Sequence, residues 1–449
     1  MIQIRPLLLC FFGIFLFNQA NAQVIKVALS EVNGQHILLR DGKPYYVKGA
    51  GGYTQMDILV EMGGNSIRTW SAADARKVLD EAHEKGLTVM VGLWVGHERH
   101  GFDYNNLTAI SKQLVHFTSI VNELKDHPAI LFWGIGNEVD LFYSNTHVWD
   151  AIQDIAAMIH RVDPNHPTST VTAGLDSLEV ALILEKAPDI DIYCINTYGD
   201  IGSVPENIRK FGWEGPYMIT EWGPNGHWEV AKTPWGAPLE QTSEEKAVSY
   251  DNRYKDYIDR YKNKGSLGSY VFLWGQKQET TETWYGLFDA QGRPTRALDQ
   301  LQRNWSGALP ANQAPIIRSL TLNGSDAKGG DKLVFYSDNK ISAEIIAEDP
   351  DGDKLEYEWA VLPEATNTGA GGDVEDALQS IPGKLKKVRG NTAQIIVPES
   401  EGGYRLFVKV VDPEGKVGYA NIPFYSYPSG PDAEQRTWVK WKSQEMSNN

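Results

Sequence analysis

The stretch ILFWGIGNE, residues 130–138, holds the pattern that decides the fold. An apolar run of strand length ends there directly in Asn137 and Glu138. The stretch MITEWG, residues 218–223, repeats the pattern, because its apolar run ends at Glu221. Loops are solvated, which explains polar residues at strand ends but not carboxylates directly beside Trp and Gly. The pattern predicts strands whose ends meet at one site.

Short apolar runs alternate with amphipathic helical patterns on both sides of these stretches. The eight runs are residues 45–50, 65–69, 87–93, 130–135, 168–172, 190–195, 217–220 and 269–273. One helix is expected to begin at Thr242, with Glu245 as the third residue of a capping box. Eight strands alternating with helices over about 260 residues predict a (β/α)8 TIM barrel. A doubly wound open sheet is the alternative, but its dinucleotide-binding glycine fingerprint is missing.

A second, all-β part follows the predicted barrel. Residues 309–315, LPANQAP, are typical of a linker, and strand-like runs with turn signals come after them. This spacing predicts an immunoglobulin-like β-sandwich. The expected divisions are a signal peptide at 1–22, the barrel at 23–308, the linker at 309–315, the sandwich at 316–430 and a tail at 431–449.

Composition narrows the class of partner. The 449 residues include 42 Lys and Arg against 58 Asp and Glu, a formal net charge of -16. This balance argues against a nucleic-acid partner, which would require a basic surface. The 14 Trp residues indicate flat apolar faces on which a ligand stacks, or else core packing.

The first 22 residues have the pattern of a signal peptide. Arg5 precedes an apolar run at 7–17, and residues 20–22 form an A-x-A cleavage site. That run is too short to span a bilayer. Removal of the signal peptide would also remove Cys10 and leave Cys194 as the remaining cysteine, so no internal disulfide is expected. We expect a secreted or periplasmic protein with no membrane span, and a monomer.

Glu138 and Glu221 are the predicted catalytic pair. They follow the fourth and seventh predicted strands, whose ends face one opening of a barrel. Glycoside hydrolysis uses two such carboxyl groups, one protonated to donate to the leaving oxygen and one ionised to attack the anomeric carbon. A lone Glu after a strand is more often a salt-bridge partner. Two in separate motifs favour catalysis on a polysaccharide or oligosaccharide, without a metal or cofactor.

Four motifs carry a family resemblance. Residues 133–138 (WGIGNE) and 219–223 (ITEWG) resemble the fourth- and seventh-strand motifs of clan-A retaining glycoside hydrolases. Residues 64–70 (GNSIRTW) and 272–274 (FLW) are similar to strands two and eight of that clan. The resemblance implies that Glu138 is the general acid/base and Glu221 the nucleophile.

The same resemblance implies roles for four neighbours. Arg68 would help to keep Glu221 ionised, and Tyr198 would hydrogen-bond Glu221. Asn137 would bond the sugar 2-hydroxyl, and Trp274 would form the floor of the subsite that holds the scissile sugar.

A narrower resemblance concerns domain order. A barrel followed by an immunoglobulin-like domain resembles bacterial endo-β-1,3-glucanases of glycoside hydrolase family 158, which implies a laminarinase-like enzyme acting on β-glucan. Family 2 barrels are similar around residues 41–44, but they normally carry two β-domains before the barrel, and about 20 residues precede Pro44 here after the signal peptide. The open alternatives are a β-glucan transglycosylase, a β-mannanase or β-1,4-glucanase, and a non-catalytic glycan-binding barrel.

Aromatic side chains outside these motifs are candidates for sugar contacts. The long loop at residues 223–243 carries Trp228 and Trp235, which are expected either to wall a glycan cleft or to fix the loop to the barrel rim. Trp94 and Trp284 are expected in sugar subsites. His97 is expected to contact sugar or to be a satisfied loop histidine.

The acidic turn at residues 349–353 is a separate candidate. Asp349, Asp351 and Asp353 offer oxygen ligands for calcium, although the EF-hand pattern is absent. Acidic turns without metal are common between strands, and we expect the second domain to have a structural role.

Overall fold

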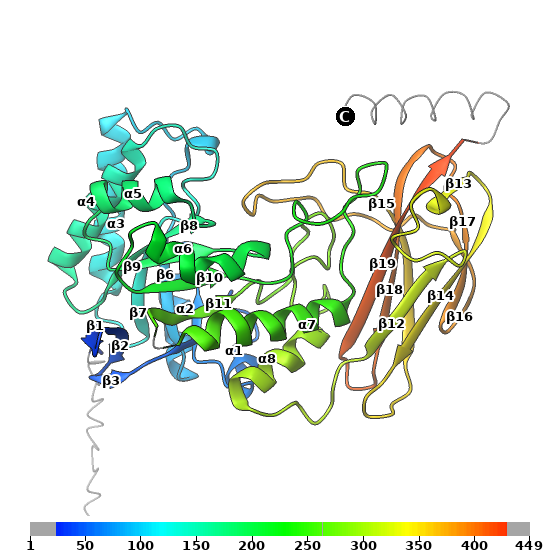
Figure 1. Ribbon diagram of the computed structural model, residues 1–449, viewed down its shortest axis with the longest axis horizontal. Coiled ribbons are helices and arrows are strands. Elements are labelled where there is room, and N and C mark those ends of the chain that lie inside the picture. Colours follow the sequence, from blue (N-terminus) through cyan, green and yellow to red (C-terminus); the bar gives the residue numbers. More distant parts are fainter. Residues whose placement is uncertain (1–23, 263, 429–449) are drawn as a thin grey trace, which may run out of the picture.

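The computed structural model describes residues 24–262 and 264–428 (Figure 1). Its centre is a closed parallel barrel in the order β10-β11-β4-β5-β6-β7-β8-β9. The strands are β4 (Val47–Gly51), β5 (Ser66–Arg68), β6 (Thr88–Leu93), β7 (Ile130–Ile135), β8 (Thr168–Ala173), β9 (Ile192–Asn196), β10 (Tyr217–Glu221) and β11 (Ser266–Val271). The predicted TIM barrel is confirmed. The predicted signal peptide and tail lie outside the described residues.

A helix follows each barrel strand, and all of these helices but the last connect successive strands. They are α1 (Met56–Glu61), α2 (Ala75–Glu84), α3 (Leu107–Leu124), α4 (His147–Val162), α5 (Ser177–Lys186), α6 (Val204–Lys210), α7 (Ser243–Arg253) and α8 (Arg296–Ser306). Shorter helical turns are η1 (Glu98–His100), η2 (Gly199–Ser203), η3 (Tyr254–Ile258), η4 (Asp259–Tyr261) and η5 (Gly330–Leu333). The predicted capping box opens α7: Thr242 accepts from the Glu245 backbone at 3.2 Å, and its own N–H donates to the Glu245 carboxylate at 2.8 Å. Within the described ranges, every helix is too short or too polar to cross a membrane.

A small sheet covers the N-terminal end of the barrel. It consists of β1 (Val27–Val32), β2 (Gln35–Arg40) and β3 (Lys43–Pro44) and lies on the side away from the sandwich (Figure 1). Val27 and Leu38 are buried in the same apolar cluster as Phe132 and Tyr270 of the barrel strands. The C-terminal end of the barrel therefore remains as the end at which the strand-terminal side chains can meet a ligand.

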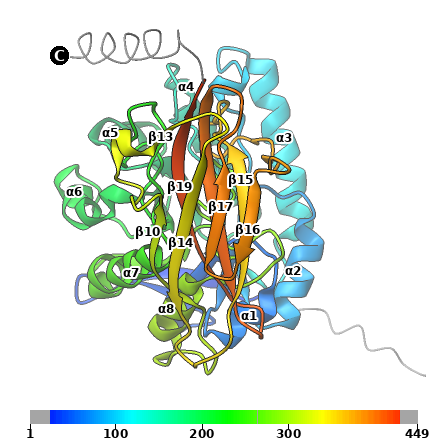
Figure 2. The same ribbon diagram turned by 90° about the vertical axis from the view of Figure 1, so that its right-hand side faces the viewer.

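Two antiparallel-rich sheets form the second domain (Figure 2). One has the order β12-β14-β17-β16 and the other β13-β19-β18-β15. The strands are β12 (Ile316–Leu322), β13 (Val334–Tyr336), β14 (Lys340–Glu348), β15 (Glu356–Pro363), β16 (Leu385–Arg389), β17 (Thr392–Ile396), β18 (Gly402–Val411) and β19 (Val417–Tyr427). Alternating apolar residues such as Ile345, Val361 and Leu406 are fully buried between the sheets. The predicted β-sandwich is confirmed.

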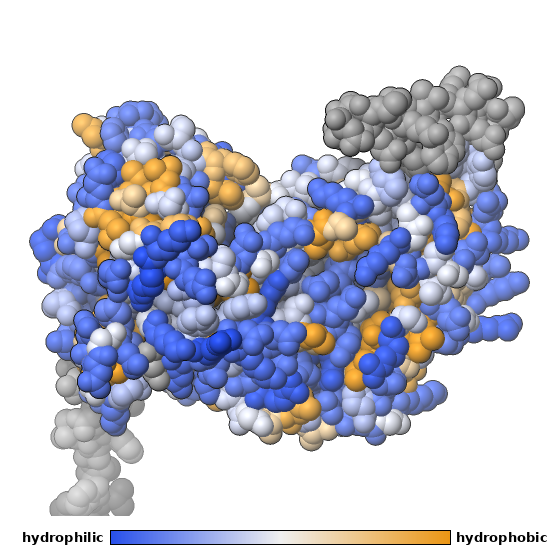
Figure 3. All heavy atoms as spheres, viewed as in Figure 1, coloured by the Kyte–Doolittle hydropathy of each residue, from blue (hydrophilic) through white to orange (hydrophobic). Residues whose placement is uncertain are grey.

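Buried polar contacts join the sandwich to the barrel. Lys246 of α7 pairs with Glu240 at 2.5 Å, and both side chains are almost fully buried. Asn421 of β19 donates to the other oxygen of Glu240 at 2.7 Å and accepts from Arg405 of β18 at 2.7 Å. In the space-filling view the two domains form one continuous body with a largely hydrophilic face (Figure 3).

Candidate active site

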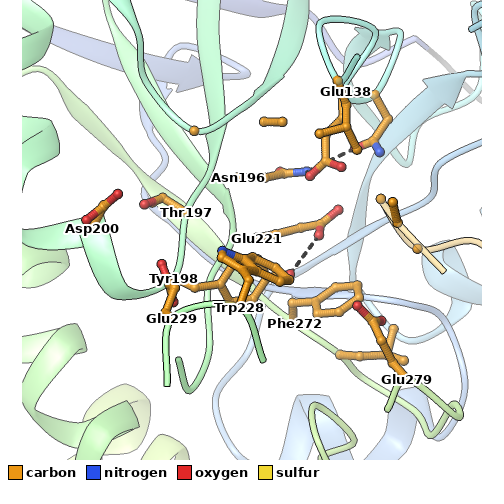
Figure 4. A pocket seen from close by; sticks show the side chains of 18 of the residues that line it. Glu138, Asn196, Thr197, Tyr198, Asp200, Glu221, Trp228, Glu229, Phe272 and Glu279 are labelled. Atoms are coloured by element: carbon orange, nitrogen blue, oxygen red, sulfur yellow. Dashed lines mark hydrogen bonds between the residues drawn. The ribbon is translucent and has the colours of Figure 1, made fainter. Parts of the chain in front are cut away.

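A cleft of about 750 Å³ lies at the C-terminal end of the barrel and contains both predicted catalytic residues (Figure 4). The loops after β5 to β11 contribute to its lining. The polar side chains that line it include Asn137, Glu138, Asn196, Tyr198, Asp200, Glu221, His227, Glu229, Lys277 and Glu279. The ends of separate strands are thus brought together, as expected for this fold.

Glu221 ends β10 and is held by three donors. Its Oε1 accepts from Arg68 at 3.0 Å and from the Trp70 indole at 2.7 Å. Its Oε2 accepts from the Tyr198 hydroxyl at 3.0 Å. Hydrogen bonds and a cation at a carboxylate favour its ionised form. These three donors fix the orientation of the carboxyl group, and only 5% of the residue is exposed.

The positions of Arg68 and Trp70 follow from tight backbone packing. Arg68 lies at the end of β5, is 1% exposed, and also donates to the Thr220 carbonyl at 2.7 Å and to Asn137 at 2.5 Å. Gly92 on β6 lies against the Trp70 backbone, where an added Cβ would be 2.4 Å from the Trp70 carbonyl carbon. A side chain at this glycine would displace the strand end that presents Trp70 to Glu221.

Glu138 has a different environment. Its backbone adopts a left-handed φ of 51°, a conformation that non-glycine residues rarely adopt and that often marks functional sites. One carboxylate oxygen accepts from the Asn196 amide at 2.8 Å. Burial, reinforced by the nearby charge of Glu221, raises the pKa of Glu138 to about 8. Glu138 is therefore protonated at neutral pH.

Two carboxyl groups in different environments thus face the same cleft (Figure 4). Asn196 connects them, because it donates to Glu138 and its oxygen accepts from Arg68 at 3.2 Å, which in turn donates to Glu221. Glycoside hydrolysis uses one carboxyl group as acid and a second one as nucleophile, and the raised pKa of Glu138 suits the acid. The cleft can therefore donate a proton on one side of a bound group and supply a negative oxygen on the other.

Four predicted site residues line the cleft with the carboxyl pair, namely Trp94, Asn137, Tyr198 and Trp228. The exposed fraction is 39% for Trp94 and 56% for Trp228, so both indoles present surface to a ligand. Arg68 does not line the cleft. It lies beneath it, in contact with Glu221.

Two predicted subsite tryptophans do not line the cleft. Trp274 is 1% exposed, donates to the Thr54 carbonyl at 2.7 Å and packs on Phe288. Phe272 and Leu273, the two residues before it, line the cleft instead. Trp284 is 2% exposed, packs in an aromatic cluster with Phe272 and Tyr285, and donates from its indole to the Asn225 carbonyl at 2.9 Å. The expected sugar contacts of both tryptophans are therefore wrong.

Trp235 and His97 also lie outside the cleft lining. The Trp235 ring packs against Tyr425 of the sandwich at a centroid distance of 5.8 Å, so it fixes the loop in place. His97 is 2% exposed and donates from Nε2 to the Asn137 carbonyl at 2.6 Å. It supports the backbone of the catalytic motif, which corrects its expected contact with sugar.

Several lining residues were missed in the sequence. Trp70 and Asn196 each stand at the end of a predicted strand, which is the signal that could have identified them. Phe142 lies four residues after Glu138 and is 72% exposed. Lys277 and Glu279 belong to the irregular segment after β11, where no periodic pattern marks them.

The acidic turn uses its carboxylates internally. Asp349 accepts from the backbone N–H groups of Asp351 and Asp353 at 2.9 and 3.1 Å. Asp351 accepts from the Gln313 backbone at 2.7 Å. In the described part of the chain, no three His, Cys, Asp or Glu residues are grouped to hold a metal ion.

The closed barrel and its pair of carboxyl groups define a barrel protein of the glycoside hydrolase class. The chain belongs to glycosyl hydrolases family 2, whose TIM barrel domain matches residues 53–307. This family assignment replaces the expected membership of family 158. The match covers the barrel. The expectation that family 2 does not apply, because its barrels normally follow two β-domains, was therefore wrong.

Curated relatives carry the name β-glucuronidase. The protein from Paenibacillus borealis is 24% identical over 314 residues, covering 61% of this chain and 51% of that protein. The protein from Felis catus is 25% identical over 189 residues, covering 36% of this chain and 26% of that protein. This chain therefore matches about half, or less, of the length of these relatives. A solved β-glucuronidase structure from Dictyoglomus thermophilum aligns with a TM-score of 0.49 and 20% identity, over 63% of this chain and 54% of that one.

Proposed function

We propose that this chain is a retaining β-glycosidase in which Glu138 is the general acid/base and Glu221 the nucleophile. The observation that carries the proposal is the opposite environment of the two carboxyl groups. The pKa of Glu138 is raised to about 8 by burial and by the charge of Glu221. Glu221 accepts three hydrogen bonds, one of them from the guanidinium group of Arg68.

The proposed reaction is a double displacement. Glu221 attacks the anomeric carbon while Glu138 donates its proton to the glycosidic oxygen, so the carbon–oxygen bond to the leaving group breaks. Glu138, now ionised, removes a proton from water, which attacks the anomeric carbon and releases Glu221. Asn137 lies in the cleft beside both groups, where we assign it to the sugar 2-hydroxyl.

The charge of the cleft supports a neutral sugar. Its lining includes the carboxyl side chains of Asp200, Glu221, Glu229 and Glu279, besides that of the proposed acid Glu138. Among the described residues that line the cleft, Lys277 is the one Lys or Arg, and its ammonium group pairs with Glu279 at 2.9 Å. The carboxylate of a bound uronate would lose its hydration in this cleft, and Lys277, already paired with Glu279, would not compensate that loss. We therefore propose a neutral sugar at this site, in contrast to the glucuronide in the names of the relatives, and we keep β-glucan as the proposed substrate from the sequence analysis.

The linkage within that glucan is a proposal from the sequence alone, because the family 2 match that replaces family 158 does not carry it. Cleavage inside β-1,3-glucan chains is expected, with transglycosylation, β-1,4-glucan and β-mannan as alternatives. Product analysis on laminarin, curdlan, mixed-linkage glucan, carboxymethylcellulose and β-mannan distinguishes them. Release of short β-1,3 oligosaccharides supports the proposed linkage, and products from another glycan contradict it.

A direct test compares aryl β-glucoside with aryl β-glucuronide for the wild type, Glu138→Gln and Glu221→Gln. We expect the wild type to prefer the glucoside and both variants to lose activity. Glu206→Gln is a matched control, because Glu206 is exposed on α6. NMR of the first product should show the β anomer. Preference for the glucuronide would contradict the neutral substrate, and an initial α anomer would contradict retention.

We also propose export from the cell and a monomeric state. The support for export is the signal-peptide pattern of residues 1–22, which lie outside the described residues. N-terminal sequencing of the mature protein tests cleavage before Gln23, and sedimentation tests the oligomeric state.

A further inference from the structure

The segment between β15 and β16, residues 364–384, leaves the sandwich and reaches the barrel (Figure 1). Gly369, Ala370, Gly371 and Gly372 of this segment line the same cleft as the carboxyl pair. The second domain therefore contributes surface to the site, although its sequence suggested a structural role alone.

Charged contacts hold this segment on two sides of the cleft. Arg99, in the loop after β6, pairs with Asp373 at 2.7 Å and donates to the Ala370 carbonyl at 3.1 Å. His100 lies 3.0 Å from the other oxygen of Asp373. On the far side, Glu375 accepts from the Thr280 backbone, after β11, at 2.7 Å.

These two attachment points explain where the segment lies. In the barrel order, β4 and β5 stand between β11 and β6. Their connections to the next helices are short, residues 52–55 and 69–74, whereas residues 94–106 follow β6 and precede α3. The rim is therefore low above β4 and β5, and the sandwich segment closes this side.

The part that faces the cleft presents mostly main chain. Gly371 has a φ of 56°, and an added Cβ would lie 2.5 Å from the Leu141 side chain. A side chain at Gly371 would therefore require the end of the Leu141 side chain to move and would occupy a left-handed φ that favours glycine. Main-chain N–H and C=O groups at a cleft surface can bind and orient sugar hydroxyls.

We propose that residues 369–373 form a substrate-binding wall that sets how many sugar units the cleft accepts, with Asp373 as the positioning residue that fixes the wall against Arg99. The proposal rests on the proposed glycosidase function and deepens it. A glycan chain that meets this wall contacts it beyond the scissile sugar, so the wall distinguishes oligosaccharides from small aryl glycosides.

The test compares Asp373→Ala with the matched control Asp376→Ala, because Asp376 is exposed in the same segment and lies outside the wall. The readout is kcat/KM for a tetrasaccharide divided by kcat/KM for an aryl monoglycoside. We expect Asp373→Ala to lower this ratio at least threefold, mainly through KM for the tetrasaccharide, while the control keeps the wild-type ratio.

Arg99→Gln provides a second variant. If Arg99 and Asp373 act through one contact, the double variant Arg99→Gln/Asp373→Ala should change this ratio of kcat/KM values no more than Asp373→Ala alone does. An unchanged ratio in Asp373→Ala overturns the inference. A wild type that cleaves the aryl glucuronide but not the glucoside overturns the neutral-sugar proposal instead, and the ratio is then measured on glucuronide-terminated oligosaccharides.

Discussion

The side-chain amide of Asn196 donates a hydrogen bond to Glu138 at 2.8 Å. This bond stabilises the ionised carboxylate and opposes the effect of burial on the pKa of Glu138. The proton affinity of the proposed acid is thus set by opposing contributions, because burial and the charge of Glu221 raise the pKa whereas the Asn196 amide lowers it.

Replacement of Asn196 by Ala should raise the pKa of Glu138 further, because the bond that lowers it is lost. The basic limb of the kcat/KM profile should move to higher pH, and kcat should fall because the carboxyl group is less well oriented. A pH profile between 5 and about 10 measures the shift. A basic limb at the wild-type position would show that the amide does not control this titration.

The wild-type profile should lose activity as the pH rises through about 8, because Glu138 must carry its proton to act as the acid. Glu138→Gln should remove this limb and lower kcat by about 10²–10⁴ for substrates with poor leaving groups. Aryl glycosides with acidic leaving groups should be affected less. An equal loss for both leaving groups would contradict the assignment of Glu138 as the acid.

Trp228 and Trp274 should respond differently to truncation. Trp228→Ala removes an exposed cleft surface, so KM for the glycan should rise severalfold, corresponding to about 1 kcal/mol, with little change in Tm. Trp274→Ala creates a cavity and should lower the free energy of unfolding by about 3–5 kcal/mol. Thermal unfolding and steady-state kinetics of both variants separate binding from packing. A stable Trp274→Ala protein with raised KM would contradict the reported placement.

Lys246 should be important for stability rather than catalysis. Lys246→Met leaves Glu240 buried without its cation, which should cost about 3–5 kcal/mol in the free energy of unfolding. Adding Glu240→Gln should recover part of this loss, because the buried charge is gone. Denaturant unfolding measures both variants, and Lys255→Met in an exposed pair is a suitable control. Equal stability of Lys246→Met and the control would contradict the argument.

The sequence was sufficient for features set by local patterns. Apolar runs bounded by turn signals gave strands β4 to β11, and Glu138 and Glu221 were recognisable because they end such runs. The direction of a side chain beside a strand end depends on packing, so Trp274 was assigned to the cleft although Phe272 and Leu273 occupy that place. The contact between Arg99 and Asp373 joins residues 274 positions apart, and no local pattern announces it.

The polar contacts across the domain boundary bear on how such chains can be recombined. Glu240 of the barrel loop receives hydrogen bonds from both Lys246 and Asn421, and Arg405 donates to the Pro238 carbonyl at 2.9 Å. A foreign sandwich grafted after the barrel would need a donor at the position of Asn421, and one at that of Arg405, to satisfy these buried acceptors. Exchange of the sandwich between enzymes is therefore restricted to source proteins whose sandwich carries a compatible interface, and the barrel and the sandwich would be inherited together.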